Sequence, residues 1–233
     1  MGLGDMPSIL GFRCTISDVR VRNAIEYVLT RIRERQRDDF KRLRRKVRGF
    51  HWLPKEEAQN GTLGHWKRVP ITKAFQLETE REAKALLRQE YPCRLHPPPK
   101  HVRHLADALR QEEHRRPGKV HLCRELTDAP EFRLLSTIAH ELGHAATTQE
   151  DFEKRDSALG GDSEWASESC ADYYAYRWGF GRQVRRCQRT RRVGHHGGLP
   201  GDVIQIAGPT GKSLKYRVTR NFYYRRVEPG EID

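Results

Sequence analysis

Hydrophobic residues recur at helical spacing along the first half of the chain. From Ser17 or Asp18 onward, apolar positions follow one another at intervals that put them on one side of a helix, and Gly49 is placed to end it. These positions are Ile25, Leu29, Ile32, Phe40, Leu43 and Val47. Similar patterns predict helices over residues 79–89 and 101–113, separated by a proline-rich break that regular helix does not tolerate.

Shorter patterns predict the strands and loops. Residues 119–123 alternate between apolar and polar side chains, which predicts a short strand, whereas the polar residues 54–72 contain Asn60-Gly61 and are typical of a loop or hairpin. Residues 201–227 predict a small antiparallel β unit. Arginine crowds residues 182–192, where we expect a flexible basic linker.

Two more amphipathic helices are predicted over residues 131–147 and 163–178. Together the patterns predict an α+β fold in three parts. These are a basic, mainly helical N-terminal region over residues 1–92, a core over 100–180, and an arginine-rich linker with the small β unit over 181–233.

The composition indicates a folded and strongly basic protein. Of the 233 residues, 36% are hydrophobic and 32% are charged, and the formal net charge is +13. An excess of that size attracts polyanions before any specific contact forms, so nucleic acid, either DNA or RNA, is the first partner to consider. A basic surface that is merely solvated is the alternative. The residues expected to contact nucleic acid are Arg42, Arg44, Arg45, Arg185, Arg186 and Arg189.

Two further features favour a cytoplasmic location. No stretch of the chain reaches the roughly 20 apolar residues that span a bilayer, so we expect no membrane partner. The five cysteines are widely spaced and include no Cys-x-x-Cys pair. This arrangement predicts neither a disulfide framework nor a zinc ribbon, and it fits the reduced thiols of a cytosolic protein.

One predicted helix carries the residues of a metal site. His140 and His144 are four residues apart, so their imidazoles project from one side of the helix, where both can reach one Zn²⁺ ion. Glu141 lies beside them, and a carboxylate there can accept a proton from a zinc-bound water and later return it to a leaving amine. The surrounding run, residues 137–146, has no charged residue except Glu141 and no proline, as a buried active-site helix requires.

A catalytic zinc typically takes three protein ligands, so a third must come from elsewhere. The helix over residues 163–178 offers Glu164, Glu168 and Asp172 on one face. Glu168 is the best third ligand, and Asp172 one turn later is placed to hydrogen-bond a ligating histidine. Glu164 and Glu150 remain rival ligands.

These motifs carry a family resemblance. The run from His140 to His144, followed by Glu168 and Asp172, resembles the gluzincin branch of the zincin metallopeptidases. The stretch after Glu168 is also similar to the ImmA/IrrE and antirestriction ArdC-type metallopeptidases, although Asp172 stands where the ImmA/IrrE helix commonly has asparagine. The resemblance covers residues 119–178. It implies a zincin-like core of two facing helices beneath a small sheet, a bound zinc, and hydrolysis of a protein or peptide substrate paired with strand 119–123.

Zincins also stabilise the tetrahedral oxyanion with a second group, commonly a tyrosine or histidine. Tyr174 is our choice, and the other candidates are Tyr173, Tyr176, His195 and His196. The sequence therefore predicts a zinc metallopeptidase that acts on or near nucleic acid. A nucleic-acid-binding protein with a structural, non-catalytic zinc site is the alternative, and zinc-dependent hydrolysis of a bond other than a peptide is a third possibility.

Overall fold

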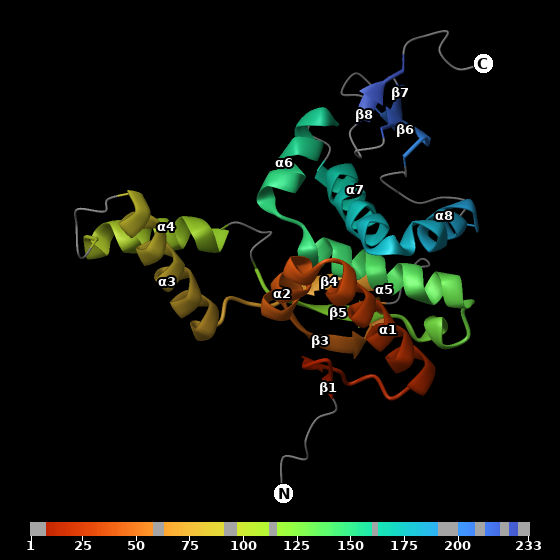
Figure 1. Ribbon diagram of the computed structural model, residues 1–233, viewed down its shortest axis with the longest axis horizontal. Coiled ribbons are helices and arrows are strands. Elements are labelled where there is room, and N and C mark those ends of the chain that lie inside the picture. The colour runs from red at the N-terminus through yellow and green to blue at the C-terminus, as the bar shows by residue number, and fades with distance from the viewer. Residues whose placement is uncertain are drawn as a thin grey trace, which may run out of the picture.

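The computed structural model describes residues 8–57, 63–90, 97–111, 116–159, 163–190, 200–207, 213–219 and 224–227. The fold is α+β and mostly helical, with a small mixed three-stranded sheet packed against helices (Figure 1). Among the described residues, no helix combines the length and the hydropathy that crossing a membrane would take.

The mixed sheet is built from strands that are far apart in the sequence. Its order is β3 (Val47–Trp52), β5 (Gly118–Leu122) and β4 (Gly64–Arg68), with β3 parallel and β4 antiparallel to the central strand β5. The strand predicted over residues 119–123 is therefore β5. Both of its edges are already paired, so the expectation that this strand binds an extended substrate was wrong.

The single helix expected to end at Gly49 is two helices and a strand. Helix α1 (Val19–Arg35) begins at an N-cap in which Asp18 accepts a hydrogen bond from the Val21 amide. Gln36 then leaves helical geometry, with φ −144° and ψ 72°, before α2 (Arg37–Lys46). The chain continues directly into β3, so Gly49 lies in a strand. Helical periodicity missed this change because Val47 and the following residues bury against β5.

The chain between β4 and β5 forms a helical hairpin. Helices α3 (Lys73–Glu90) and α4 (Pro99–Gln111) pack on each other and project from the body of the molecule (Figure 1). The hairpin has a small apolar cluster of its own, made of Ala83, Leu87, Val102, Ala106 and Leu109. The predicted loop upstream contains a short 3-10 helix, η1 (Lys55–Glu57), and β4, whose partner is the distant β5 and not a local hairpin strand.

Helices dominate the second half of the chain. A short 3-10 helix, η3 (Arg124–Thr127), leads into α5 (Glu131–Ala146), α6 (Gln149–Ala158) and α7 (Ser163–Ala175), and the chain continues through η4 (Tyr176–Phe180) into α8 (Gly181–Thr190). The linker expected over residues 182–192 was thus wrong for α8, which forms because Val184 and Cys187 are buried. Residues 191–199 lie outside the described part of the chain.

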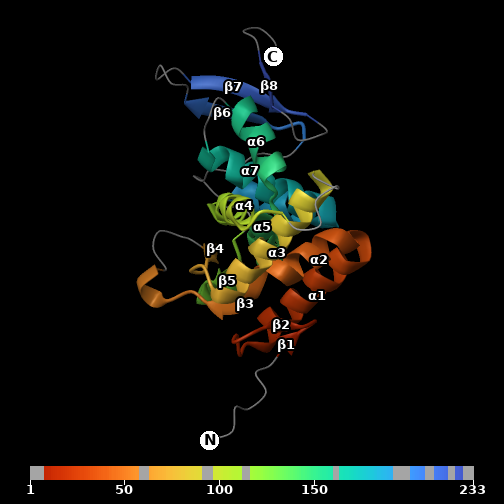
Figure 2. The same cartoon turned by 90° about the vertical axis from the view of Figure 1, so that its left-hand side faces the viewer.

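Small antiparallel sheets stand at both ends of the described chain. Near the N-terminus, β1 (Ser8–Ile9) pairs with β2 (Phe12–Arg13). At the other end, β6 (Val203–Ala207), β7 (Ser213–Val218) and β8 (Tyr224–Arg226) form the predicted antiparallel unit, and Figure 2 shows them at the side opposite the N-terminus.

One hydrophobic core joins the helices to the mixed sheet. Ile25 of α1, Phe50 of β3, Val120 of β5 and Leu142 of α5 are fully buried members of the same cluster. The predicted N-terminal region and the predicted core therefore share one interior. This shared interior fixes α5 against the sheet and sets the position of its outward-facing histidines.

Candidate metal centre

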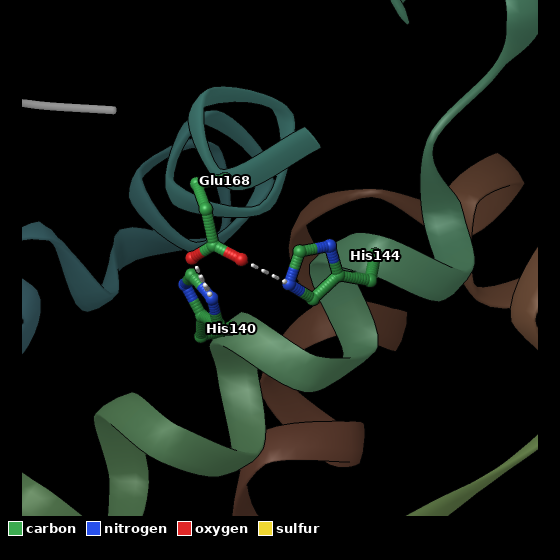
Figure 3. A group of neighbouring side chains, drawn as sticks. All are labelled: His140, His144 and Glu168. Carbon is green, nitrogen blue, oxygen red and sulfur yellow. Dashed lines mark ion pairs between the residues drawn. The ribbon is translucent and has the colours of Figure 1, made fainter. Parts of the chain in front are cut away.

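Helix α5 presents both histidines toward α7. Ile138, Ala139 and Leu142 are fully buried in the core, which leaves His140 and His144 on another side of the same helix. Their imidazole rings are perpendicular, with centroids 4.8 Å apart. Figure 3 shows the two rings on successive turns, with Glu168 of α7 reaching between them.

A glycine allows α7 to come this close. A β-carbon placed on Gly143 would lie 2.4 Å from the carbonyl oxygen of Ala171 and 2.7 Å from its Cα. Real β-carbons essentially never approach another atom within 3.0 Å. The absence of a side chain at Gly143 therefore lets the backbones of α5 and α7 come into contact. This close packing places Glu168 of α7 next to the two histidines of α5.

The three side chains converge on one point. Nε2 of His140 lies 3.0 Å from Oε2 of Glu168, and Nε2 of His144 lies 3.3 Å from Oε1 of the same carboxylate (Figure 3). One ligand atom from each residue lies within 4.8 Å of the others. His140, His144 and Glu168 therefore form a group that could hold a metal ion. Within the described part of the chain it is the one group of this kind.

The Nδ1 nitrogens of both histidines lie within hydrogen-bond distance of side-chain oxygens on α7. Nδ1 of His140 lies 2.9 Å from Oδ1 of Asp172, whose side chain is completely buried. Nδ1 of His144 lies 3.2 Å from Oγ of Ser167. A histidine that donates Nδ1–H to such an oxygen keeps the lone pair of Nε2 for a metal. Ser167 was missed by the sequence reasoning, although its position next to Glu168 could have suggested it.

Burial and neighbouring charges shift the pKa values of this group in opposite directions. Burial by itself would lower the pKa of His140, but the carboxylates of Glu168 and Asp172 raise that pKa well above its usual value. Burial would likewise raise the pKa of Glu168, yet the two histidines hold it far below the usual range. Without a metal the two carboxylates therefore favour a proton on His140, and a metal ion bound there would displace that proton.

Glu141 lies beside the group at the edge of the sheet. Its side chain is buried, and a β-carbon on Gly64 of β4 would lie only 2.8 Å from Oε1 of Glu141. The edge strand therefore runs directly against this carboxylate. The contact also escaped prediction, because Gly64 and Glu141 are separated by the whole α3–α4 hairpin.

The rival ligands lie outside the group. Glu150 is exposed and its carboxylate is paired with Lys154 at 2.6 Å. Glu164 is exposed at the start of α7. Residues 191–199, which include His195 and His196, lie outside the described part of the chain.

Tyr174 is engaged elsewhere. It is 1% exposed, and its hydroxyl donates a hydrogen bond to Asp151 at 2.6 Å and accepts one from Arg42 at 3.0 Å. Burial and the neighbouring Asp151 raise the pKa of this hydroxyl. These contacts tie α2, α6 and α7 together and favour a structural role for Tyr174, and its expected oxyanion role stays a prediction.

Several arginines expected to meet nucleic acid make contacts within the chain. Arg42 also donates to the Ala146 carbonyl, and Arg44 donates to the Leu10 carbonyl. Arg185 donates to Asp202, and the guanidinium of Arg186 lies 4.1 Å from the ring centroid of Phe132. Arg45 is exposed, and the side chain of Arg189 is outside the described part. Four of these six arginines thus make contacts within the chain, and a nucleic-acid role for the six stays a prediction.

Comparison with protein-family models, with curated proteins and with solved structures finds no match for this chain. The functional argument therefore rests on the geometry of His140, His144 and Glu168.

Proposed function

We propose that the protein is a zinc-dependent metallopeptidase of the zincin type, with a gluzincin-like ligand set. The observation that carries the proposal is the convergence of His140, His144 and Glu168 with Glu141 next to them on the same helix. Two imidazoles and one carboxylate suit zinc, and three protein ligands are the number that leaves a position open in catalytic zinc sites. A zinc bound there would acidify a water molecule and polarise a substrate carbonyl.

Glu141 supplies the proton transfers. Its carboxylate follows His140 directly on α5 and is largely shielded from solvent, being 7% exposed. From this position it accepts a proton from the attacking water and returns it to the nitrogen of the leaving amine. Asp172 and Ser167 hold the imidazoles in the orientation that points Nε2 at Glu168.

The edge strand β4 of the mixed sheet is the place where we expect a peptide substrate to bind. Strand β4 pairs with β5 on one side, and within the described part of the chain no strand pairs with its other edge. An extended peptide can add to such an edge through main-chain hydrogen bonds. Because Gly64 of β4 lies against Glu141, a peptide bound there would run past the proposed catalytic carboxylate.

Zinc content and peptide hydrolysis of three purified variants test this function. Glu141→Gln is expected to keep zinc and lose hydrolysis, because it removes the base and leaves the ligands intact. Glu168→Ala is expected to lose both. Glu164→Gln, an exposed neighbour on α7, is the matched control and is expected to behave as wild type. Full hydrolysis by Glu141→Gln would refute the mechanism, and a zinc-loaded protein that cleaves no peptide would favour a structural site.

We further propose that cleavage takes place on or near nucleic acid. The support is the formal net charge of +13, which draws a protein toward polyanions.

A further inference from the structure

The side of the mixed sheet opposite the helical core carries ionisable side chains in two cross-strand rows. In the first row, His51 of β3 and His65 of β4 are both paired in register with His121 of β5. In the second, Lys67 of β4 is paired directly with Lys119 of β5. Side chains at paired positions share a face, and those two residues apart on a strand do as well. All five residues therefore lie on one face.

This face is the one turned away from the core. Val120 and Leu122 alternate with Lys119 and His121 along β5, and both are fully buried in the core under the helices. His65 and Lys67 are exposed on the edge strand. We name the outward surface the outer face and define it by Arg13, His51, His65, Lys67, Lys119 and His121.

The outer face carries a net positive charge, which comes from Arg13, Lys67 and Lys119. Lysines at directly paired positions repel each other, so anions nearby stabilise the Lys67–Lys119 pair. One acid, Glu57, lies against this face and pairs with Lys67 at 2.7 Å.

Two histidines of the outer face, His51 and His121, have stacked rings whose protonation depends on pH. The rings of His51 and His121 are stacked, with centroids 5.6 Å apart. Burial, together with Lys119, His121 and Arg13, lowers the pKa of His51 to about 4. Burial also lowers the pKa of His121, which faces Glu57, Lys67 and His65. Both rings are therefore neutral at pH 7, and a bound polyanion would favour their protonation.

We propose that the outer face binds single-stranded nucleic acid. Arg13, Lys67 and Lys119 meet the phosphates, and the exposed ring of His65 offers a base a surface for stacking. The exposed ring of His65 favours a single strand, whose unpaired bases are free to stack, over a duplex, whose bases are already paired and stacked. The proposal locates the binding surface away from the arginines of α2 and α8, and it does not depend on peptide hydrolysis.

The first test measures the affinity of the full chain for a fluorescent oligothymidylate of about 12 nucleotides. The variant Arg13→Gln/Lys119→Gln is compared with the matched control Arg33→Gln/Arg37→Gln, which removes two exposed cations from α1 and α2. We expect the outer-face variant to bind about tenfold more weakly. Its slope of log affinity against log salt, taken between about 50 and 200 mM, should fall by about 1.4, whereas the control keeps both values. An equal loss in the two variants, or no loss in either, would overturn the proposal.

The second test separates nucleic acid from polyanions in general. His65→Ala is expected to weaken oligothymidylate binding about fivefold or more, because stacking on a base is lost, and to leave the affinity for inorganic polyphosphate unchanged. Equal losses for the two probes, or tighter binding of duplex than of single strand, would contradict a single-strand surface. Zinc content, measured on every variant, should stay at the wild-type value.

The third test measures oligothymidylate affinity as a function of pH. Because a bound strand favours protonation of His51 and His121, oligothymidylate affinity should rise as the pH falls from about 7.5 to about 5.5. The variant His51→Gln/His121→Gln should lose most of this rise. A pH dependence that is unchanged in this variant would exclude the histidine row from the surface. Since Glu141→Gln leaves the outer face intact, retained binding in that variant distinguishes the surface from the proposed peptidase site.

Discussion

Gly143 is the residue through which helix packing controls the metal centre. In Gly143→Ala the new β-carbon would stand 2.4 Å from the Ala171 carbonyl oxygen and 2.9 Å from the carbonyl carbon, and both are backbone atoms that cannot rotate away. Reaching an ordinary contact of 3.4 Å requires the two helices to separate by about 1 Å. Because Glu168 is carried by α7, its carboxylate would move away from His140 and His144 by a similar amount.

The cost has two opposing parts. Overpacking of this kind destabilises by about 1–3 kcal/mol, and alanine gains back up to about 1 kcal/mol over glycine in a helix. We therefore expect a net destabilisation of about 1–2 kcal/mol in the metal-free protein. Active sites tolerate misplacement of only about 0.5 Å, so zinc affinity should fall by about tenfold or more.

Two measurements check this prediction. Chemical denaturation of the metal-free protein gives the free energy of unfolding, and competition with a chromophoric chelator gives the zinc affinity. Gly181→Ala is the control, since its β-carbon would meet the side chain of Tyr176, which is 45% exposed and does not belong to the metal group. Wild-type zinc affinity in Gly143→Ala would refute the claim that close packing of α5 and α7 positions Glu168.

Three further predictions follow from the contacts around the site. Ser167→Ala should lower zinc affinity about tenfold through loss of the hydrogen bond to His144, as measured by chelator competition, whereas the neighbouring Ser163→Ala should not. Tyr174→Phe should cost about 1–2 kcal/mol of unfolding free energy and leave peptide hydrolysis intact, and a large loss of turnover would restore its expected catalytic role. In metal-free protein, the raised pKa of His140 stabilises the fold below the usual value of 6.5 and loses that contribution as pH rises through the folded value. The lowered pKa of Glu168 stabilises the fold above the usual value of 4.5 and loses its contribution as pH falls, so denaturation curves should show this pair acting most strongly between pH 4.5 and 6.5.

The sequence predicted the metal group because the spacing of its residues within each helix is a local pattern. His140 and His144 are one helical turn apart, and Glu168 and Asp172 repeat that spacing on the second helix, so helical geometry alone brings each pair to one side. That the two helices face each other was implied by the family resemblance. Gly143, which allows the contact, gave no signal of its own because its role depends on Ala171 of the other helix.

Long-range pairing explains what the sequence could not predict. The partner of β4 lies beyond the α3–α4 hairpin, so no local pattern placed Gly64 next to Glu141 or made β5 the central strand. The rows of the outer face arise from the same pairing, since His51, His65 and His121 are scattered in the sequence. The many arginines of residues 182–192 led to the prediction of a linker in place of α8. The few apolar residues of this helix, such as Val184, nevertheless bury one of its sides.

X-ray absorption at the zinc edge tests the central claim most directly. Purified wild-type protein is expected to contain about one zinc per chain, bound by imidazole nitrogens at about 2.0 Å and by oxygen, without sulfur. In Glu168→Ala this signal should be lost or sharply reduced, and in Glu164→Gln it should be unchanged. Sulfur ligation, or a zinc site that is the same with and without Glu168, would contradict the assignment of His140, His144 and Glu168 as the metal ligands.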